Sequence, residues 1–193
     1  MKRKIYSVIL FLALCGFFFA QKASDAGAFW SSLNQQCGKA FEGKVTNDSA
    51  QSSDFLEKRL TMSVFECSAN TVKVGFFVGE DASRTWVFTR AKSSGNLTLK
   101  HDHRKKDGSP DEITKYGGTS SNKGTENIQF FPADSFTAGL VPAAAQNVWW
   151  IQLDEYKFVY NLNRIGTDRK FSVSFNLKHP VHEPRTPWGW IKK

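Results

Sequence analysis

Apolar and polar residues alternate along much of this chain, most clearly between residues 147 and 177. Period-two alternation is typical of strands that bury one face. Here it runs through three successive segments separated by short polar turns, so we expect three antiparallel strands. Their inward-facing residues would be Trp149, Ile151, Leu153, Tyr156, Phe158, Tyr160, Leu162, Phe171, Val173, Phe175 and Leu177.

The two turns between these segments set the register of the predicted meander. A two-residue turn at Asp154-Glu155 would place apolar residues opposite one another in the pairs Leu153–Tyr156, Ile151–Phe158 and Trp149–Tyr160. Asp and Glu resist the positive φ that such a turn needs, so a turn one residue longer is an alternative. Residues 165–168 suit a four-residue loop, which would pair Tyr160 with Val173.

The same alternation recurs earlier in the chain. It predicts strands over residues 39–46, 59–67, 72–78, 85–91, 95–103 and 128–131. Turn-forming polar residues lie between several of these segments, as hairpin connections require. Ala40 or Phe41 would face inward from the first of these strands, where Gly43 allows a bend. The later inward-facing residues would be Leu60, Met62, Val64, Val72, Val74, Phe76, Val78, Trp86, Phe88, Leu97, Leu99, His101 and His103.

A helical pattern precedes the first strand. Four apolar residues recur at positions i, i+3, i+4 and i+7, namely Ala26, Phe29, Trp30 and Leu33. Asp25 or Ser24 would cap the start of this helix, and Gly38 would stop it. We expect a short amphipathic helix, packed on the sheet or across one end of a barrel.

About nine strands in nearest-neighbour order predict an all-β fold. An antiparallel up-and-down barrel fits best because closure removes exposed edges, and a two-sheet β-sandwich is the alternative. Residues 104–127 read as a long polar loop, with Ile113 and Tyr116 as its larger apolar residues. Residues 134–145 could hold a helical turn. Residues 179–193 form a Pro/Trp-rich tail, which Trp188 and Trp190 would hold against the barrel.

An N-terminal helix followed by a meander barrel of this size resembles the calycins, the lipocalins and their relatives. Lipocalins carry Gly-X-Trp at the start of the first strand, whereas this chain has Gly38-Lys39-Ala40-Phe41 there. The string from His101-Asp102-His103-Arg104 to Tyr116-Gly117-Gly118 is also similar to small secreted bacterial proteins without an assigned function. The first resemblance implies a barrel, and the second implies no particular activity.

The length of 193 residues favours one domain, spanning residues 21–193 after a signal peptide at 1–20. Residues 2–4 are basic, and 5–19 form an apolar run that is short for a membrane span. Phe18 makes the cleavage site after Ala20 imperfect, so an uncleaved anchor is an alternative. Cys15 follows Leu14 where a lipoprotein needs a small residue, so lipidation is not expected. We expect a secreted or periplasmic protein without a membrane span in its mature chain.

The net charge limits the kinds of partner to be expected, and the cysteine content indicates the cellular compartment. Loss of the three cations at residues 2–4 lowers the formal net charge from +8 to +5. The remaining cations are spread along the chain, whereas nucleic-acid binding normally concentrates them on one face, so nucleic acid is not an expected partner. Two cysteines remain after processing, and an oxidising compartment favours a disulfide between Cys37 and Cys67.

The histidines carry the clearest candidate chemistry. His101 and His103 would lie on one face of a strand, where two imidazoles can share a metal. His179, His182 or Glu183 could supply a third ligand. Neutral imidazoles suit Zn, Cu or Ni. The alternative is that these histidines hydrogen-bond the adjacent acidic loop and bind nothing.

An apolar cavity is the second candidate site. Five aromatic residues could line a ligand pocket inside the barrel, namely Trp86, Phe88, Trp149, Phe158 and Tyr160. The alternative is a filled core, since aromatic faces usually pack.

These patterns favour a binding protein without enzymatic activity, because the sequence contains no hydrolase elbow, zinc-protease motif or phosphate-binding loop. Its partner would be a small apolar ligand or an envelope protein. A metal-binding protein or metal-dependent enzyme that uses His101 and His103 is one alternative. An envelope structural or interaction module is the other.

Overall fold

The computed structural model describes residues 25–182 and 184–190. The predicted signal peptide, with Cys15, lies outside the described residues, and so does Glu183, the third metal ligand considered above.

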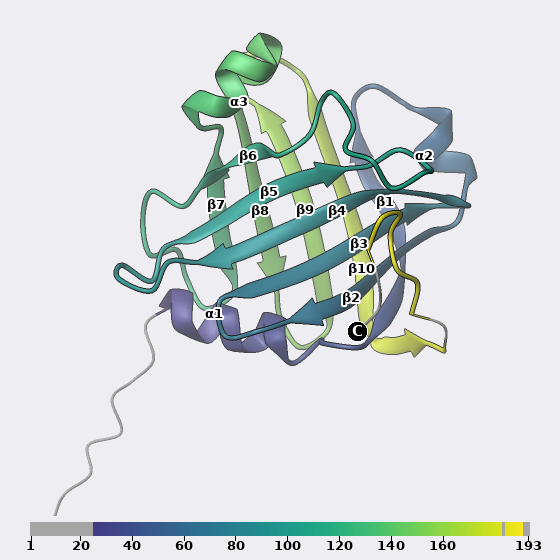
Figure 1. Ribbon diagram of the computed structural model, residues 1–193, viewed down its shortest axis with the longest axis horizontal. Helices are drawn as coiled ribbons and strands as arrows, with labels where there is room; N and C mark the ends of the chain where they lie inside the picture. Colours follow the sequence, from purple (N-terminus) through teal and green to yellow (C-terminus); the bar gives the residue numbers. More distant parts are fainter. Residues whose placement is uncertain (1–24, 183, 191–193) are drawn as a thin grey trace, which may run out of the picture.

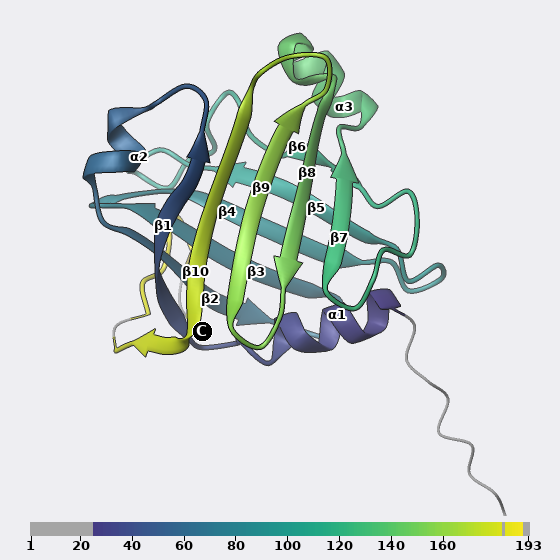
Figure 2. The same cartoon turned by 180° about the vertical axis from the view of Figure 1, so that it is seen from behind.

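Within the described residues, ten strands form one antiparallel sheet. The strands are β1 (Ala40–Asp48), β2 (Leu60–Cys67), β3 (Thr71–Val78), β4 (Asp81–Arg90), β5 (Leu97–His103), β6 (Tyr116–Thr119), β7 (Ile128–Pro132), β8 (Asn147–Leu153), β9 (Lys157–Arg164) and β10 (Lys170–Val181). Their order is β6-β5-β4-β3-β2-β1-β10-β9-β8-β7, so each strand lies beside its sequence neighbour and β1 also pairs with β10. Figure 1 and Figure 2 show the two halves of this sheet facing each other.

The two outer strands of this order, β6 and β7, come together and nearly close the sheet into a barrel. Gly118 forms a bridge with Ala133, and the Asp134 amide donates to the Gly117 carbonyl at 3.0 Å. The approach is very close, since a Cβ on Gly118 would lie 1.6 Å from the Pro132 carbonyl oxygen. The predicted all-β barrel is therefore confirmed, and the strands do not form the alternative two-sheet sandwich.

About nine strands were expected, and β6 is the additional one that brings the number observed in the described residues to ten. It lies within residues 104–127, which the sequence presented as one long loop. Its four residues, Tyr-Gly-Gly-Thr, show no alternation, and they become a strand by pairing with β5. Pairing with a neighbouring strand thus sets the structure of a segment with little strand propensity of its own.

Helix α1 (Asp25–Asn34) crosses one end of the barrel, against β7 and β8 (Figure 1). It buries the four residues whose spacing predicted it, Ala26, Phe29, Trp30 and Leu33. The chain after it is tied to β2 by the predicted disulfide between Cys37 and Cys67, whose Cα atoms lie 6.1 Å apart. This end of the barrel is therefore closed.

The other helical segments are α2 (Ser53–Glu57), α3 (Ser135–Leu140) and the 3-10 helix η1 (Pro142–Ala144). Helix α3 falls where a helical turn was predicted, and the Asp134 side chain caps it by accepting from the Thr137 amide at 3.0 Å. Both views place α3 at the end of the barrel opposite α1 (Figures 1 and 2). Among the residues that the structure describes, no helix is long and apolar enough to cross a membrane.

The closing meander forms as predicted, with one change of register. Tyr160 pairs with Val173 across the four-residue loop, as expected. At the first turn, however, Leu153 pairs with Phe158 and not with Tyr156, because the Asp154 carboxylate accepts from the Tyr156 and Lys157 amides at 2.8 and 2.9 Å. These bonds hold a wider turn and shift the pairing by two residues. An even shift keeps the paired side chains on their faces, so the apolar side of the strands stays buried. Tyr156 is the exception: it was predicted to face inward, but the wider turn leaves it outside β9 with 58% of its surface exposed.

The barrel interior is filled by packed aromatic side chains. The Trp86 ring stacks on Tyr160 at 4.5 Å between centroids and on Phe76 at 5.0 Å. Phe88, Trp149 and Phe158, like the other predicted cavity residues, are buried in the same hydrophobic cluster. This arrangement corresponds to the filled core considered above as the alternative to an apolar cavity.

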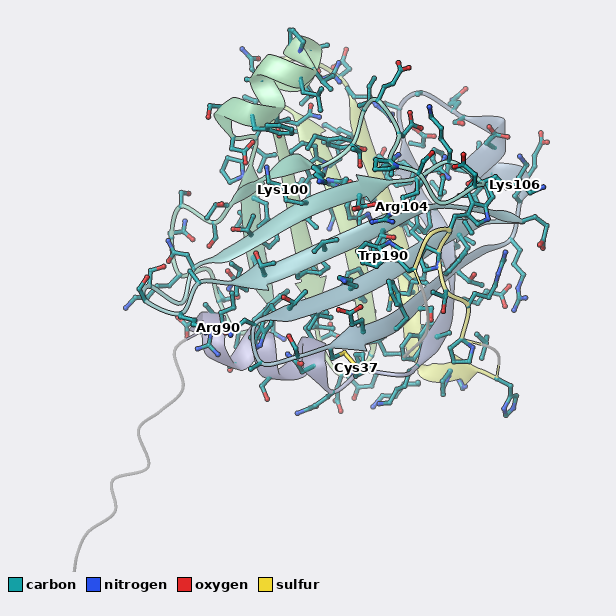
Figure 3. The ribbon with its side chains drawn as sticks, in the orientation of Figure 1. Cys37, Arg90, Lys100, Arg104, Lys106 and Trp190 are labelled. Atoms are coloured by element: carbon teal, nitrogen blue, oxygen red, sulfur yellow. A yellow bond between two sulfur atoms is a disulfide. The ribbon has the colours of Figure 1, made fainter. Side chains whose placement is uncertain are left out.

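The C-terminal tail begins later than expected, because β10 continues through 179–181 and Val181 pairs with Ala40. Residues 184–190 then cross the outer face of the sheet (Figure 3). Pro187 is buried, and the Trp190 ring lies between the Lys73 ammonium at 3.7 Å and the Arg104 guanidinium at 4.2 Å. Of the two tryptophans predicted to hold the tail, Trp190 does so through its ring, whereas Trp188 is half-buried and its backbone amide donates to the Ala82 carbonyl at 3.0 Å; Pro187 adds a buried contact.

Candidate functional site

The end of the barrel opposite α1 carries a cleft of about 430 Å³. It opens between the last residues of β5 and β9, the start of β8, and the α3–η1 segment. The residues that line it are His103, Asp111, Glu112, Ile113, Tyr116, Val141, Ala144, Asn147, Trp149, Tyr160, Leu162 and Arg164. We call this site the mouth cleft.

His101 lies below the mouth cleft, on the inner face of β5. Its side chain follows Leu97 and Leu99 in the period-two pattern, and only 3% of it is exposed. Nδ1 lies 3.1 Å from the Tyr116 carbonyl, which can only accept, so Nδ1 carries the proton. Nε2 then accepts from the Tyr160 hydroxyl at 2.8 Å. Burial, together with the charges of His103 and Lys100, lowers the pKa of His101 to about 3, so it is neutral at physiological pH.

His103 occupies the next inward position and reaches the cleft itself. Its Nε2 lies 3.1 Å from the Tyr116 hydroxyl, and its backbone amide donates to Thr114 Oγ1 at 2.7 Å. Burial and then the Arg84 charge lower the pKa of His103 to about 4, although Asp111 and two further carboxylates act in the opposite direction. A neutral imidazole therefore faces the cleft.

Tyr116 joins the two histidines. Its ring stacks on His101 at 4.6 Å with an interplanar angle of 10°. Burial raises the pKa of its phenol to about 12, so the hydroxyl keeps its proton and can donate to His103. His103, Tyr116, His101 and Tyr160 thus form a polar chain, in which Tyr116 joins the two histidines through separate groups, its hydroxyl and its backbone carbonyl.

Three charged residues also line the mouth cleft, Arg164 on one side and Asp111 and Glu112 on the other. Arg164 donates from Nε to the Asn147 side-chain oxygen at 3.0 Å, which holds the guanidinium at the end of β9. Asn147 is buried, whereas Asp111 and Glu112 are exposed on the facing loop. Trp149 and Leu162 supply apolar surface between these groups. The cleft thus combines an apolar floor with a few fixed polar groups.

The structure brings together only part of the predicted metal site. His101 and His103 share one face as expected, but His179 and His182 line two separate grooves on the outside of the barrel. The described ranges contain no group of three or more His, Cys, Asp or Glu side chains arranged to hold a metal. The predicted convergence of His179 or His182 with this pair is therefore not found. In addition, both ring nitrogens of His101 are already hydrogen-bonded.

The predicted ligand-binding residues divide between the core and the cleft. Trp149 and Tyr160 line the cleft, whereas Trp86, Phe88 and Phe158 lie deeper in the core. Sequence reasoning did not select Asn147 and Arg164. The sequence distinguished Tyr116 only as a large apolar residue within a polar segment. This contrast was the one signal that could have pointed to its place in the cleft.

Fold and site together define a nearly closed antiparallel barrel with a filled interior, one end closed by a helix and one polar mouth. A comparison with protein-family models, curated proteins and solved structures finds no match to this chain.

Proposed function

We propose that this protein binds a small molecule in the mouth cleft and does so without catalysis. The observation that carries the proposal is the cleft itself, where the neutral His103–Tyr116 pair and Arg164 stand around the Trp149 floor. Ligand sites commonly have volumes of about 300–1,000 Å³ and combine apolar walls with a few placed polar groups. At about 430 Å³, the mouth cleft falls within that range.

The lining residues indicate the kind of ligand. Trp149 and Leu162 favour a compact apolar body, and Arg164 favours an acidic or strongly accepting group. The buried Asn147 orients Arg164, so the guanidinium is positioned before a ligand arrives. A small amphipathic molecule matches this arrangement if its one acidic group lies against Arg164 and not against Asp111 and Glu112 on the facing loop.

Binding without catalysis is favoured by the same residues. The described residues that line the mouth cleft include no Ser, Thr, Cys or Lys nucleophile, and its two carboxylates, Asp111 and Glu112, are exposed on a loop. His103 Nε2 is paired with the Tyr116 hydroxyl, which burial keeps protonated, and among the described residues no carboxylate hydrogen-bonds to the His103 ring, although Asp111 acts on it through its charge. These features suit a pocket that holds its ligand unchanged.

We further propose that the protein works in a secretory or periplasmic compartment. The Cys37–Cys67 disulfide supports this placement, because disulfides persist in oxidising environments. The N-terminal pattern of basic residues followed by an apolar run is the second support.

Filling the mouth cleft tests the proposed function. The probe is 1-anilinonaphthalene-8-sulfonate, which has an apolar body and one acidic group and fluoresces when bound. We expect Leu162→Trp to weaken its binding at least tenfold, because the larger ring occupies the cleft. Ile165→Trp is the control, since Ile165 is 52% exposed in the adjacent loop and does not line the cleft. Equal binding by the wild type and both variants would place the ligand elsewhere.

A further inference from the structure

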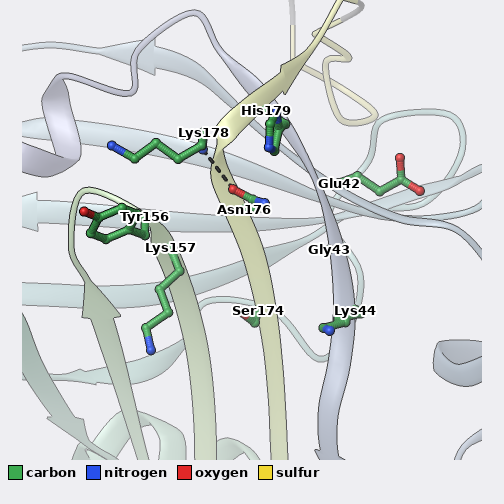
Figure 4. Close-up of a pocket in the computed structure, with 9 residues that line it drawn as sticks. All are labelled: Glu42, Gly43, Lys44, Tyr156, Lys157, Ser174, Asn176, Lys178 and His179. Carbon is green, nitrogen blue, oxygen red and sulfur yellow. Dashed lines mark hydrogen bonds between the residues drawn. The ribbon is translucent and has the colours of Figure 1, made fainter.

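We propose that the outer face of the barrel carries a second binding site, a groove along β10 that takes an acidic oligosaccharide. This groove, which we call the β10 groove, has a volume of about 680 Å³ and lies between β9, β10 and β1 (Figure 4). It is separate from the mouth cleft, because the two share no lining residue.

An irregularity in strand pairing builds the β10 groove. Phe41 pairs with Pro180, but two residues later Gly43 pairs with Phe175. Residues 176–179 therefore face Glu42 alone, and β10 bends away from β1 (Figure 4). Such bulges re-aim side chains and are common beside functional sites. Here the bend directs residues 176–179 away from the regular ladder.

Four donor side chains cluster on the outer face of the sheet beside this bend. Lys44 pairs with Ser174 across β1 and β10, and Lys157 pairs with Asn176 across β9 and β10. Directly opposed residues on one face have Cβ atoms about 4.5–5.5 Å apart, so the two lysines flank the Ser–Asn row. All four residues line the groove (Figure 4).

These donors are free to receive an anion. The Asn176 side-chain oxygen accepts from the Lys178 amide at 3.0 Å, which fixes the side chain and leaves its Nδ2 to donate. Within the described ranges, Ser174 Oγ has no hydrogen-bond partner, and neither Lys44 nor Lys157 forms an ion pair.

The carboxylates near the groove do not cancel its charge. Glu42 pairs with Arg59 at 3.2 Å and Glu155 pairs with Lys178 at 3.3 Å, so both are matched by other cations. The charges of Lys44 and Lys157 remain. Together with the Ser174 and Asn176 donors, they suit a carboxylate, sulfate or phosphate group.

The rest of the groove favours a sugar as the carrier of that acidic group. Tyr156 stands at its edge with 58% of its surface exposed; the Lys178 ammonium lies 4.4 Å from the ring centroid, and the other ring face can pack against the apolar face of a sugar. No Leu, Ile, Val, Phe or Trp belongs to the described lining, so the groove offers nothing for an acyl chain to enter. It is open along the sheet, which suits a segment of a longer chain. An anionic membrane surface is thus the less favoured carrier.

The test uses purified protein with its disulfide intact and oligosaccharides of polygalacturonic acid. Titration calorimetry measures affinity, and amide chemical shifts locate the site. We expect binding that shifts the amides of Ser174 and Asn176, with no binding of a neutral glucose oligosaccharide of equal length. Lys44→Gln/Lys157→Gln should weaken binding at least tenfold, and Tyr156→Ala should also weaken it.

Lys92→Gln/Lys123→Gln is the matched control. It removes the same charge from two exposed residues outside the β10 groove, and we expect unchanged affinity. Equal weakening by both double variants would show binding by overall charge and overturn the proposal. Absence of sugar binding, or binding to phosphatidylglycerol vesicles alone, would also overturn it. Probe binding at the mouth cleft should be unchanged in Lys44→Gln/Lys157→Gln, so the two sites are tested independently.

Discussion

At the scale of single residues, the polar chain from His103 to Tyr160 is the unusual feature of this barrel. A buried polar group is costly unless it is hydrogen-bonded, and both ring nitrogens of His101 have partners. These two hydrogen bonds offset the desolvation cost of the His101 ring as long as the ring is neutral. Protonation would place a second N–H against a hydroxyl that can rotate to accept, but it would also bury a charge.

The two histidines of this polar chain predict that the stability of the fold depends on pH. The pKa values of His101 and His103 are lowered from 6.5 to about 3 and about 4. The unfolded state therefore binds more protons between these values and 6.5, so stability is full above pH 6.5 and falls as pH decreases. We expect the free energy of unfolding to drop by roughly 2–3 kcal/mol for each histidine between pH 7 and pH 4.5.

Urea denaturation at a series of pH values measures this effect. The window ends at pH 4.5 because the lowered pKa values of carboxyls such as Asp48 and Asp134 place their titration below it. His103→Gln should flatten the dependence by removing one of the two groups. A wild-type stability that stays constant from pH 7 to pH 4.5 would show that the histidines are not held neutral.

At the scale of elements, the closure between β6 and β7 depends on glycine. A Cβ on Gly118 would lie 1.6 Å from the Pro132 carbonyl oxygen, and one on Gly117 would lie 2.0 Å from the Leu99 carbonyl oxygen. Real side chains never approach backbone atoms so closely, so the strands would have to separate. Closure by β6 also positions Tyr116 over His101.

Gly118→Ala tests this closure. We expect it to destabilise the fold by several kcal/mol, in the range of about 3 kcal/mol or more that severe steric changes reach. It should also speed hydrogen exchange of the Asp134 amide, which bonds to Gly117. The matched control is Gly139→Ala in α3, where an added Cβ meets nothing within 4 Å and should be neutral or slightly stabilising. Equal stability of the two variants would contradict the account.

At the same scale, the disulfide is expected to contribute to the stability of the fold. It links Cys37, just after α1, to Cys67 at the end of β2, with a sequence separation of 30. Reduction should lower the free energy of unfolding by roughly 3–4 kcal/mol, the loop-closure entropy of a chain segment of that length. Denaturation with and without reductant measures the loss. Cys37→Ala/Cys67→Ala is the control that reductant should not affect, and an unchanged wild-type midpoint would be the contrary result.

The sequence predicted those elements whose signal is local. Helix α1 follows from the spacing of Phe29, Trp30 and their neighbours, and the Tyr160–Val173 pairing follows from loop length. The pairing of Leu153 was wrong, because the Asp154 carboxylate widens its turn by binding two amides, and a count of turn residues does not show this. Strand β6 was missed because it depends on its neighbours.

The candidate site was less predictable for the same reason. His101 and His103 could be placed on one face because the strand period is two. Tyr116, Asn147 and Arg164 come from β6, β8 and β9, and they meet His103 only after the barrel closes. Likewise, the separation of His179 and His182 from the other histidines is a property of the assembled barrel.

At the scale of the whole molecule, the two ends and the outer face of the barrel differ in structure. Helix α1 closes one end, the aromatic core fills the interior, and the mouth cleft remains at the other end. The proposed small ligand would therefore bind at the mouth and not deep in the core, as it would in a hollow barrel. The outer β10 groove is independent of this arrangement.

The most direct test of this account is an amide NMR titration of the protein with 1-anilinonaphthalene-8-sulfonate. We expect saturable shifts concentrated at the mouth cleft, in the backbone around His103, Tyr116, Asn147 and Arg164. Residues near α1 should remain unshifted. Shifts centred on the core or on α1, or no saturable shift at all, would contradict a ligand site at the mouth of a filled barrel.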